Sequence, residues 1–82
     1  MEQIARTTKQ LGAAIRRRRR GLHLSQGEVG EKTNMRQATI SALENGEPGT
    51  QLQTLTDVLA ALGLEVVVRE RSKSTGAIED IF

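Results

Sequence analysis

The stretch QGEVGEKTNMRQATISALEN, residues 26–45, decides the fold. Its pattern predicts two short helices that meet at a steep angle. Val29 and Thr33 would form the inner face of the first helix, and Gly30 would let the second helix approach closely. Asn34 falls at the turn between them, where asparagine adopts left-handed backbone geometry at low cost. The spacing therefore predicts a tight turn between two helices.

The second of these helices has two distinct faces. Met35, Ile40 and Leu43 fall on its inward face. Short or polar side chains lie near its start or on its outer side: Arg36, Gln37, Ala38, Thr39, Ser41 and Ala42. Such a face resembles the base-reading surface of a helix-turn-helix. The alternative is an ordinary helical hairpin whose exposed face is small and polar.

Composition limits what the chain can be. Its 82 residues support one small domain, and the absence of cysteine excludes disulfides and thiolate metal sites. No stretch approaches the roughly 20 apolar residues of a membrane span, and the first nine residues are too polar for a secretory signal. We therefore expect a soluble cytoplasmic protein without membrane contact.

Charge is distributed unevenly along the chain. Residues 1–46 hold nine Lys or Arg and four Asp or Glu, whereas residues 47–82 hold three and six. The basic half contains the predicted helix-turn-helix, as phosphate neutralisation would require.

Capping signals predict the helix boundaries. Three Ser or Thr residues precede Gln or Glu by three positions, typical of capping boxes: Thr7 with Gln10, Ser25 with Glu28, and Thr50 with Gln53. The predicted helices cover about 8–20, 26–33, 37–45 and 51–62, with glycines following or ending three of them. In the last helix the predicted core positions are Leu52, Leu55, Val58, Leu59 and Leu62.

The pattern then changes from helical to extended. Residues 64–71 contain a β-branched run in which Leu64, Val66, Val67 and Val68 are candidate dimerisation residues. One strand cannot satisfy its own backbone, and no second strand candidate exists. Pairing with the same strand of another copy is the simplest solution. We expect residues 1–71 to form the domain and residues 72–82 a flexible tail.

Residues 7–63 resemble the Cro/C1-type (Xre) helix-turn-helix repressors. The resemblance is carried by Leu24-Ser25-Gln26, Gln37-Ala38-Thr39-Ile40-Ser41, Leu43-Glu44-Asn45-Gly46 and Ala60-Ala61-Leu62-Gly63. The short length, the RQATIS stretch, the strand and the polar tail make the chain look most like the HipB-type antitoxins. The implied fold is all-α: a four-helix lambda-repressor-like domain, here with one C-terminal strand pairing across a dimer. Asn34 in place of the usual turn glycine, Gly27 and Gly30 within a helix, and Arg18 in place of an apolar residue depart from the pattern.

The resemblance implies roles for individual residues. Gln26, opening the first motif helix, would contact a phosphate and brace Gln37, which would read base edges. Gln37 could bond adenine N6 and N7, and Arg36 could bind guanine or a phosphate. Ala38 and Thr39 could meet thymine methyl groups, and Ser41 could reach a base or phosphate. The alternative is an idle solvated face.

Residues 16–20 are five consecutive arginines, which point in every direction around a helix and cannot all touch one DNA backbone. The resemblance implies that Arg19 pairs with Glu44 as a structural link. We expect two or three of the others to be solvated cations at a helix C-terminus, and the rest to attract phosphate without reading sequence.

An enzyme or a metal site finds no support. His23 has no further ligand at metal-binding spacing, the Ser and Thr residues lack a general base, and we expect no cofactor. The leading hypothesis is a dimeric repressor that binds a palindromic operator at its own operon and is the antitoxin of a HipA-type kinase toxin. Ile78, Ile81 and Phe82 would bind that toxin. The alternatives are a stand-alone phage-type or metabolic Xre repressor, and a protein-interaction module with a degenerate helix-turn-helix.

Overall fold

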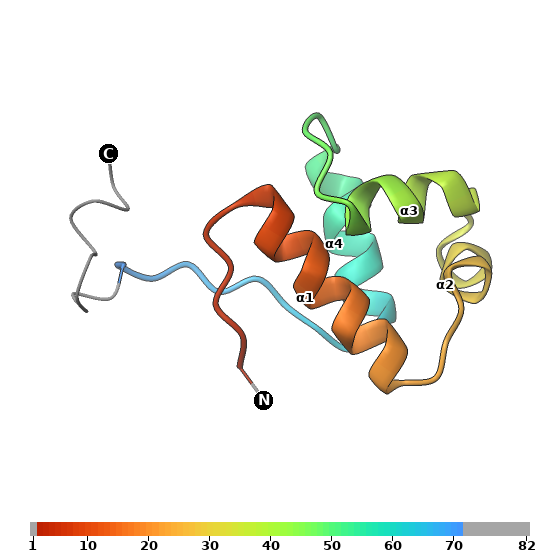
Figure 1. The fold of residues 1–82 in the computed structure, drawn as a ribbon, viewed down its shortest axis with the longest axis horizontal. Helices are drawn as coiled ribbons and strands as arrows, with labels where there is room; N and C mark the ends of the chain where they lie inside the picture. Colours follow the sequence, from red (N-terminus) through yellow and green to blue (C-terminus); the bar gives the residue numbers. More distant parts are fainter. Residues whose placement is uncertain (1, 72–82) are drawn as a thin grey trace.

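A computed structural model of the protein describes residues 2–71, and it consists of helices joined by loops (Figure 1). The helices are α1 (Thr8–Gly21), α2 (Gln26–Thr33), α3 (Gln37–Glu44) and α4 (Leu52–Ala61). α3 packs against α1 and α2, and α2 also contacts α4. The all-α four-helix prediction is therefore confirmed for these residues.

The helix starts show which capping signals operate. Ser25 and Glu28 form a complete capping box, since each side chain accepts a hydrogen bond from the other residue's backbone N–H. Thr7 accepts from the backbone N–H of Gln10 at 3.1 Å, but the Gln10 side chain accepts from Arg6 instead of returning to Thr7.

The predicted box of Thr50 and Gln53 is wrong. Gln51 is the N-cap residue of α4, and its side chain makes no capping hydrogen bond. Gln53 instead donates to Asp57, one turn further along the helix, at 2.8 Å. The first N–H groups of α4 are therefore not bonded by a capping side chain.

One apolar core holds the helices together. Its buried members come from all four helices and the end of α4: Ile15, Val29, Ile40, Leu43, Val58, Leu59 and Leu62. Leu55 packs against them partly buried, but Leu52 is 78% exposed, so its predicted place in the core is wrong. Leu52 is the first residue of α4, one turn before the part of the helix that meets the core.

The turn between α2 and α3 has the geometry that the sequence predicts. Asn34 has φ 57° and ψ 44°, the left-handed conformation. A Cβ added to Gly30 would lie 2.6 Å from the carbonyl oxygen of Met35, so only glycine fits there. Gly12 has the same role in α1, where a Cβ would lie 2.5 Å from the backbone oxygen of Glu44. These two close approaches fix α2 and α1 against the ends of α3.

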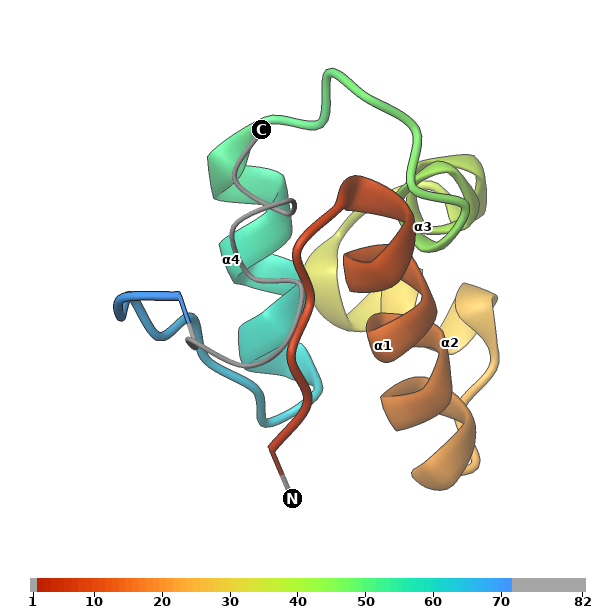
Figure 2. The same cartoon turned by 60° about the vertical axis from the view of Figure 1, so that its left-hand side comes forward.

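Two extended segments flank the helices. The N-terminal arm, residues 2–6, runs between α1 and α4 (Figure 2), and the C-terminal segment, residues 64–71, leaves the end of α4 and lines the same hollow as the arm. Arg69 of the segment forms an exposed ion pair with Glu2 of the arm at 3.1 Å. Both segments leave apolar side chains in solvent.

The C-terminal segment is neither helical nor a strand in this single chain. Leu64 is partly buried against the core, while Val66, Val67 and Val68 are 57%, 63% and 94% exposed. Pairing with a second copy stays a prediction, as does the division at residue 72. The tail residues predicted to bind the toxin, Ile78, Ile81 and Phe82, lie outside the described residues. Within residues 2–71 no helix has the length and apolar character needed to cross a membrane.

Candidate nucleic-acid interface

The outer face of α3 carries the predicted base-reading residues. Arg36, Gln37 and Ala38 are exposed, and Thr39 and Ser41 are partly buried. With about 100° of rotation per residue, Ala38 lies at the centre of this face, since it points away from the buried Ile40 and Leu43. Gln37 and Ser41 then share one edge, and Thr39 lies on the other.

The Thr39 edge borders a shallow depression between α3 and the start of α4. It is lined by Arg36, Ala38, Thr39, Ala42, Thr50, Gln51 and Thr54. The sequence pattern did not indicate the last three, because they belong to another helix and its preceding loop. Their short or polar side chains widen the polar surface around α3.

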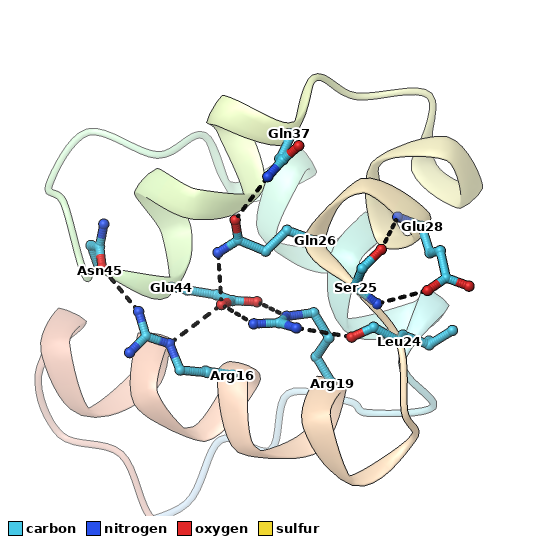
Figure 3. Close-up of polar contacts among 9 residues, drawn as sticks. All are labelled: Arg16, Arg19, Leu24, Ser25, Gln26, Glu28, Gln37, Glu44 and Asn45. Atoms are coloured by element: carbon cyan, nitrogen blue, oxygen red, sulfur yellow. Dashed lines mark hydrogen bonds and ion pairs between the residues drawn. The ribbon is translucent and has the colours of Figure 1, made fainter.

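The opposite edge of α3 meets α2 through two glutamines. Nε2 of Gln37 donates to Oε1 of Gln26 at 3.5 Å (Figure 3). Gln26 is the first residue of α2 and Gln37 the first of α3, so the capped start of α2 places them side by side. The two residues that the resemblance singled out for phosphate binding and base reading are thus in contact.

Behind the glutamines lies a buried carboxylate. The side chain of Glu44 is fully buried and forms a two-bonded ion pair with Arg19, from Nε at 2.6 Å and from Nη2 at 2.9 Å. Arg19 also donates to the carbonyl of Leu24, in the loop before α2, at 2.8 Å. The pair expected between Arg19 and Glu44 is present, and it joins α1, α3 and the start of α2.

Glu44 has two further donors, which the sequence did not reveal. Nε2 of Gln26 donates to its Oε1 at 3.1 Å, and Nε of the half-exposed Arg16 lies 3.5 Å from the same oxygen. Arg16 also bonds Oδ1 of Asn45 at 3.1 Å. Arg16 lies three residues before Arg19 and so shares its side of α1, which is the one signal in the sequence for this contact.

Opposing effects act on the ionisation of Glu44. Burial raises the pKa of the carboxyl, but hydrogen bonds from Arg19 and Gln26, the positive charge of Arg19 and the bond from Arg16 outweigh it and hold the pKa below its ordinary value. The same contact raises the pKa of Arg19. Glu44 is therefore an ionised carboxylate at neutral pH.

The other arginines of the run serve the fold more than expected. Arg17 donates two hydrogen bonds to Oε1 of Gln3 in the N-terminal arm. Arg18 donates to the carbonyl oxygen of Leu62 at 2.8 Å, which caps the end of α4. Arg18 thus replaces the packing of an apolar residue by a hydrogen bond. Arg20 is exposed.

The residue types that bind metal ions are spread over the part of the chain that the structure describes. No group of three or more His, Asp or Glu residues there could hold a metal ion. His23 lies in the exposed turn between α1 and α2 with φ 60°.

Comparison with known proteins decides the family, because residues 15–68 match the sequence profile of the helix-turn-helix family. The chain belongs to this helix-turn-helix family. The matched region contains the second half of α1 and all of α2, α3 and α4, together with the start of the C-terminal segment. The domain is thus a DNA-binding one of the Xre/Cro type, and it points to a regulator rather than an enzyme.

Solved structures of HipB are similar to this helix-turn-helix chain over most of its length. The HipA-HipB-O2-O3 complex contains a chain with 29% identity and a TM-score of 0.77, and the match covers 88% of this chain and 100% of that one. HipB in its complex with the O4 20mer gives 29% identity and 0.78, with 88% and 100% covered. HipB in an O1-O2 complex gives 30% identity and 0.75, with 85% and 100% covered. A comparison with curated proteins gives no match.

Proposed function

We propose that the protein is a sequence-specific transcriptional repressor that acts as the antitoxin of a HipA-type kinase toxin and represses its own operon. The observation that carries the DNA-binding half is the contact between Gln26 and Gln37 at the polar outer face of α3. The antitoxin half is supported by the similarity to HipB, whose solved complexes include one with HipA.

Base reading would come from the exposed start of α3. Gln37 would bond the N6 and N7 groups of adenine, and Arg36 would bind guanine or a neighbouring phosphate. Gln26 would hold a phosphate beside Gln37. Ala38 and Thr39 would meet thymine methyl groups along the centre and far edge of α3, and Ser41 would bond a base or phosphate.

A homodimer would place two copies of α3 on one palindrome. The C-terminal segment has the chemistry for antiparallel pairing with itself, because a two-fold axis at Val67 sets Val66 opposite Val68 of the second copy. The same register sets Glu65 of each copy opposite Arg69 of the other copy, so the dimer forms two complementary charge pairs. Shifting the axis by half a residue, to lie between Val67 and Val68, would oppose Glu65 to Glu70. A dimer paired in the register centred on Val67 could read two half-sites about 34 Å apart together.

The toxin would be a HipA-type kinase. The apolar tail residues Ile78, Ile81 and Phe82 would dock on it, flanked by the acidic Glu79 and Asp80. Removal of residues 74–82 should then weaken toxin binding and leave DNA affinity within a factor of a few.

Purification of the tagged full chain from its native operon tests both halves of this function. The proposal expects a HipA-type kinase and DNA from the chain's own promoter region to be recovered with it. Recovery of promoter DNA without a kinase would support a stand-alone repressor instead. Recovery of a protein partner without DNA would support an interaction module with a degenerate helix-turn-helix.

A further inference from the structure

The contacts of Glu44 extend from the ion pair toward the base-reading face. Its Oε1 receives Nη2 of Arg19 at 2.9 Å and Nε2 of Gln26 at 3.1 Å, and Oε1 of Gln26 receives Nε2 of Gln37 at 3.5 Å (Figure 3). A continuous row of hydrogen bonds thus connects a fully buried carboxylate on α3 to an exposed amide at the start of the same helix.

The hydrogen bonds of this row can run in only one direction, with each amide N–H donating toward Glu44. An ionised carboxylate accepts hydrogen bonds and donates none, so the Gln26 amide has to turn its NH2 group toward Glu44. Its carbonyl oxygen then faces Gln37, and Gln37 has to turn its own NH2 group toward Gln26. Gln37 is left with its carbonyl oxygen and its second N–H free for a ligand.

One free acceptor beside one free donor matches adenine. In the major groove adenine offers the N7 acceptor and the N6 donor, whereas guanine offers two acceptors, N7 and O6. If Gln26 were reversed, its NH2 would occupy the carbonyl of Gln37 and leave both N–H groups of Gln37 for the two acceptors of guanine. The direction of the row therefore bears on which purine Gln37 prefers.

We propose that Glu44 is a positioning residue for base reading: its acceptor-only carboxylate sets the direction of the Gln26 amide and, through it, that of the Gln37 amide. Glu44 touches no DNA in this scheme. The inference rests on the proposed function, since it assumes that Gln37 reads a base.

The test measures the ratio of affinities for adenine and guanine at the base pair where Gln37→Ala removes preference. Purified full-length variants are titrated with the two duplexes, and melting temperatures are measured in parallel so that every titration is done on folded protein. In Glu44→Gln the side chain keeps its size but can also donate, so the ratio should fall by about fivefold or more, within the range of one bidentate contact.

Arg19→Gln is the matched control. It breaks the same ion pair and lowers the melting temperature, but it keeps the Glu44 carboxyl beside Arg16 and Gln26, and titration at mildly alkaline pH keeps that carboxyl ionised. Its ratio should stay near the wild-type value. A general loss of stability cannot produce this difference between the two variants.

Gln26→Asn tests the row without touching the ion pair, and it decides the matter if Glu44→Gln does not fold. The shorter amide cannot span Glu44 and Gln37, so the ratio should fall here too. A wild-type ratio in Gln26→Asn would overturn the inference, and so would an equal loss in Arg19→Gln and Glu44→Gln. A wild-type protein without any base preference would overturn the proposed function, and this inference with it.

Discussion

The cluster around Glu44 buries and pairs its polar groups, whereas the C-terminal segment, residues 64–71, leaves apolar side chains exposed. The carboxylate of Glu44 is fully buried with three side chains donating to it, and within residues 2–71 no buried side-chain nitrogen or oxygen lacks a partner. Residues 66–68 instead expose three valines, and their segment forms no strand in the single chain. The cluster around Glu44 is therefore complete within one chain, whereas the C-terminal segment leaves three valines exposed for the proposed dimer contact.

The largest expected effect follows from breaking the cluster around Glu44. Glu44→Ala leaves the buried charge of Arg19 without its carboxylate partner, which should cost about 3 kcal/mol of unfolding free energy. In a domain of this size that corresponds to a fall in melting temperature of more than about 10 °C. Thermal unfolding followed by circular dichroism measures it.

Arg17→Ala is the matched control for this prediction. Arg17 belongs to the same run but is exposed, and among residues 2–71 its side chain bonds only to Gln3 of the arm. Its removal should change the unfolding free energy by less than about 0.5 kcal/mol. Equal melting temperatures for the two variants would contradict the structural role assigned to Glu44.

A change in the C-terminal segment should affect dimer assembly rather than folding of the single chain. Val67→Pro removes a backbone donor at the centre of the proposed strand pair, so it should yield monomers whose affinity for a palindromic operator falls by about a hundredfold. Analytical ultracentrifugation and mobility-shift titration measure the two effects.

Val67→Thr keeps a β-branched side chain at the same position and should remain dimeric. Its melting temperature should stay close to the wild-type value, whereas Val67→Pro should lose only the stabilisation that dimerisation adds, since Val67 is 63% exposed in the single chain. A wild-type protein that is monomeric at micromolar concentration would refute pairing through this segment.

Acid should reduce the stability that the cluster around Glu44 contributes. Hydrogen bonds and the charge of Arg19 outweigh burial and hold the pKa of Glu44 in the folded protein below its ordinary value, so the ionised form contributes stability above that value. This contribution is lost as the pH falls from the ordinary carboxyl range, about 4.5, through the lower folded pKa. Glu28 acts in the same direction, because its bonds with Ser25 lower its pKa.

Urea unfolding at neutral pH and at several pH values below about 4.5 separates the two carboxyls. Glu44→Gln cannot ionise at position 44, so its unfolding free energy should fall less on acidification than that of the wild type. Parallel pH profiles for the two proteins would show that Glu44 does not carry the effect.

The smallest expected effect sharpens the register of the proposed dimer. Glu65→Arg or Arg69→Glu alone would place like charges opposite each other and weaken association, whereas the double variant would restore the pairing. Each cross-strand pair should contribute about 0.2–1 kcal/mol. Because Arg69 also pairs with Glu2 in the single chain, the measurement compares dimer dissociation constants in all four proteins. Two single variants that associate as tightly as the wild type would exclude the register centred on Val67.

Local signals in the sequence predicted the elements well. Asn34 and Gly30 define the turn by their own backbone requirements, and the Ser25 box is formed by residues three positions apart. Thr50 failed as a cap because the loop before α4 places Gln51 at the N-cap position, one residue later. The three-residue spacing of a capping box does not determine the geometry of that loop.

Contacts between distant residues were harder to predict. Arg18 reaches a carbonyl 44 positions away, and Arg16 reaches Glu44 across 28. Nothing in the pattern of α1 distinguishes Arg18 from a solvated arginine, and only the spacing of three from Arg19 indicates the contact of Arg16. The Arg19 pair was expected only through the family resemblance, and the link from Glu44 to Gln26 emerged only in three dimensions.

The most direct test of the central claim, that α3 reads duplex DNA through Gln37, is selection of binding sites from a random-sequence duplex library by the full-length protein and by Gln37→Ala. The wild type should enrich a palindrome with half-sites about one helical turn apart. Gln37→Ala should lose preference at one base pair in each half-site and bind the selected palindrome more weakly by about 1–3 kcal/mol per contact. Failure of the wild type to enrich any motif, or an identical motif and affinity for Gln37→Ala, would contradict it.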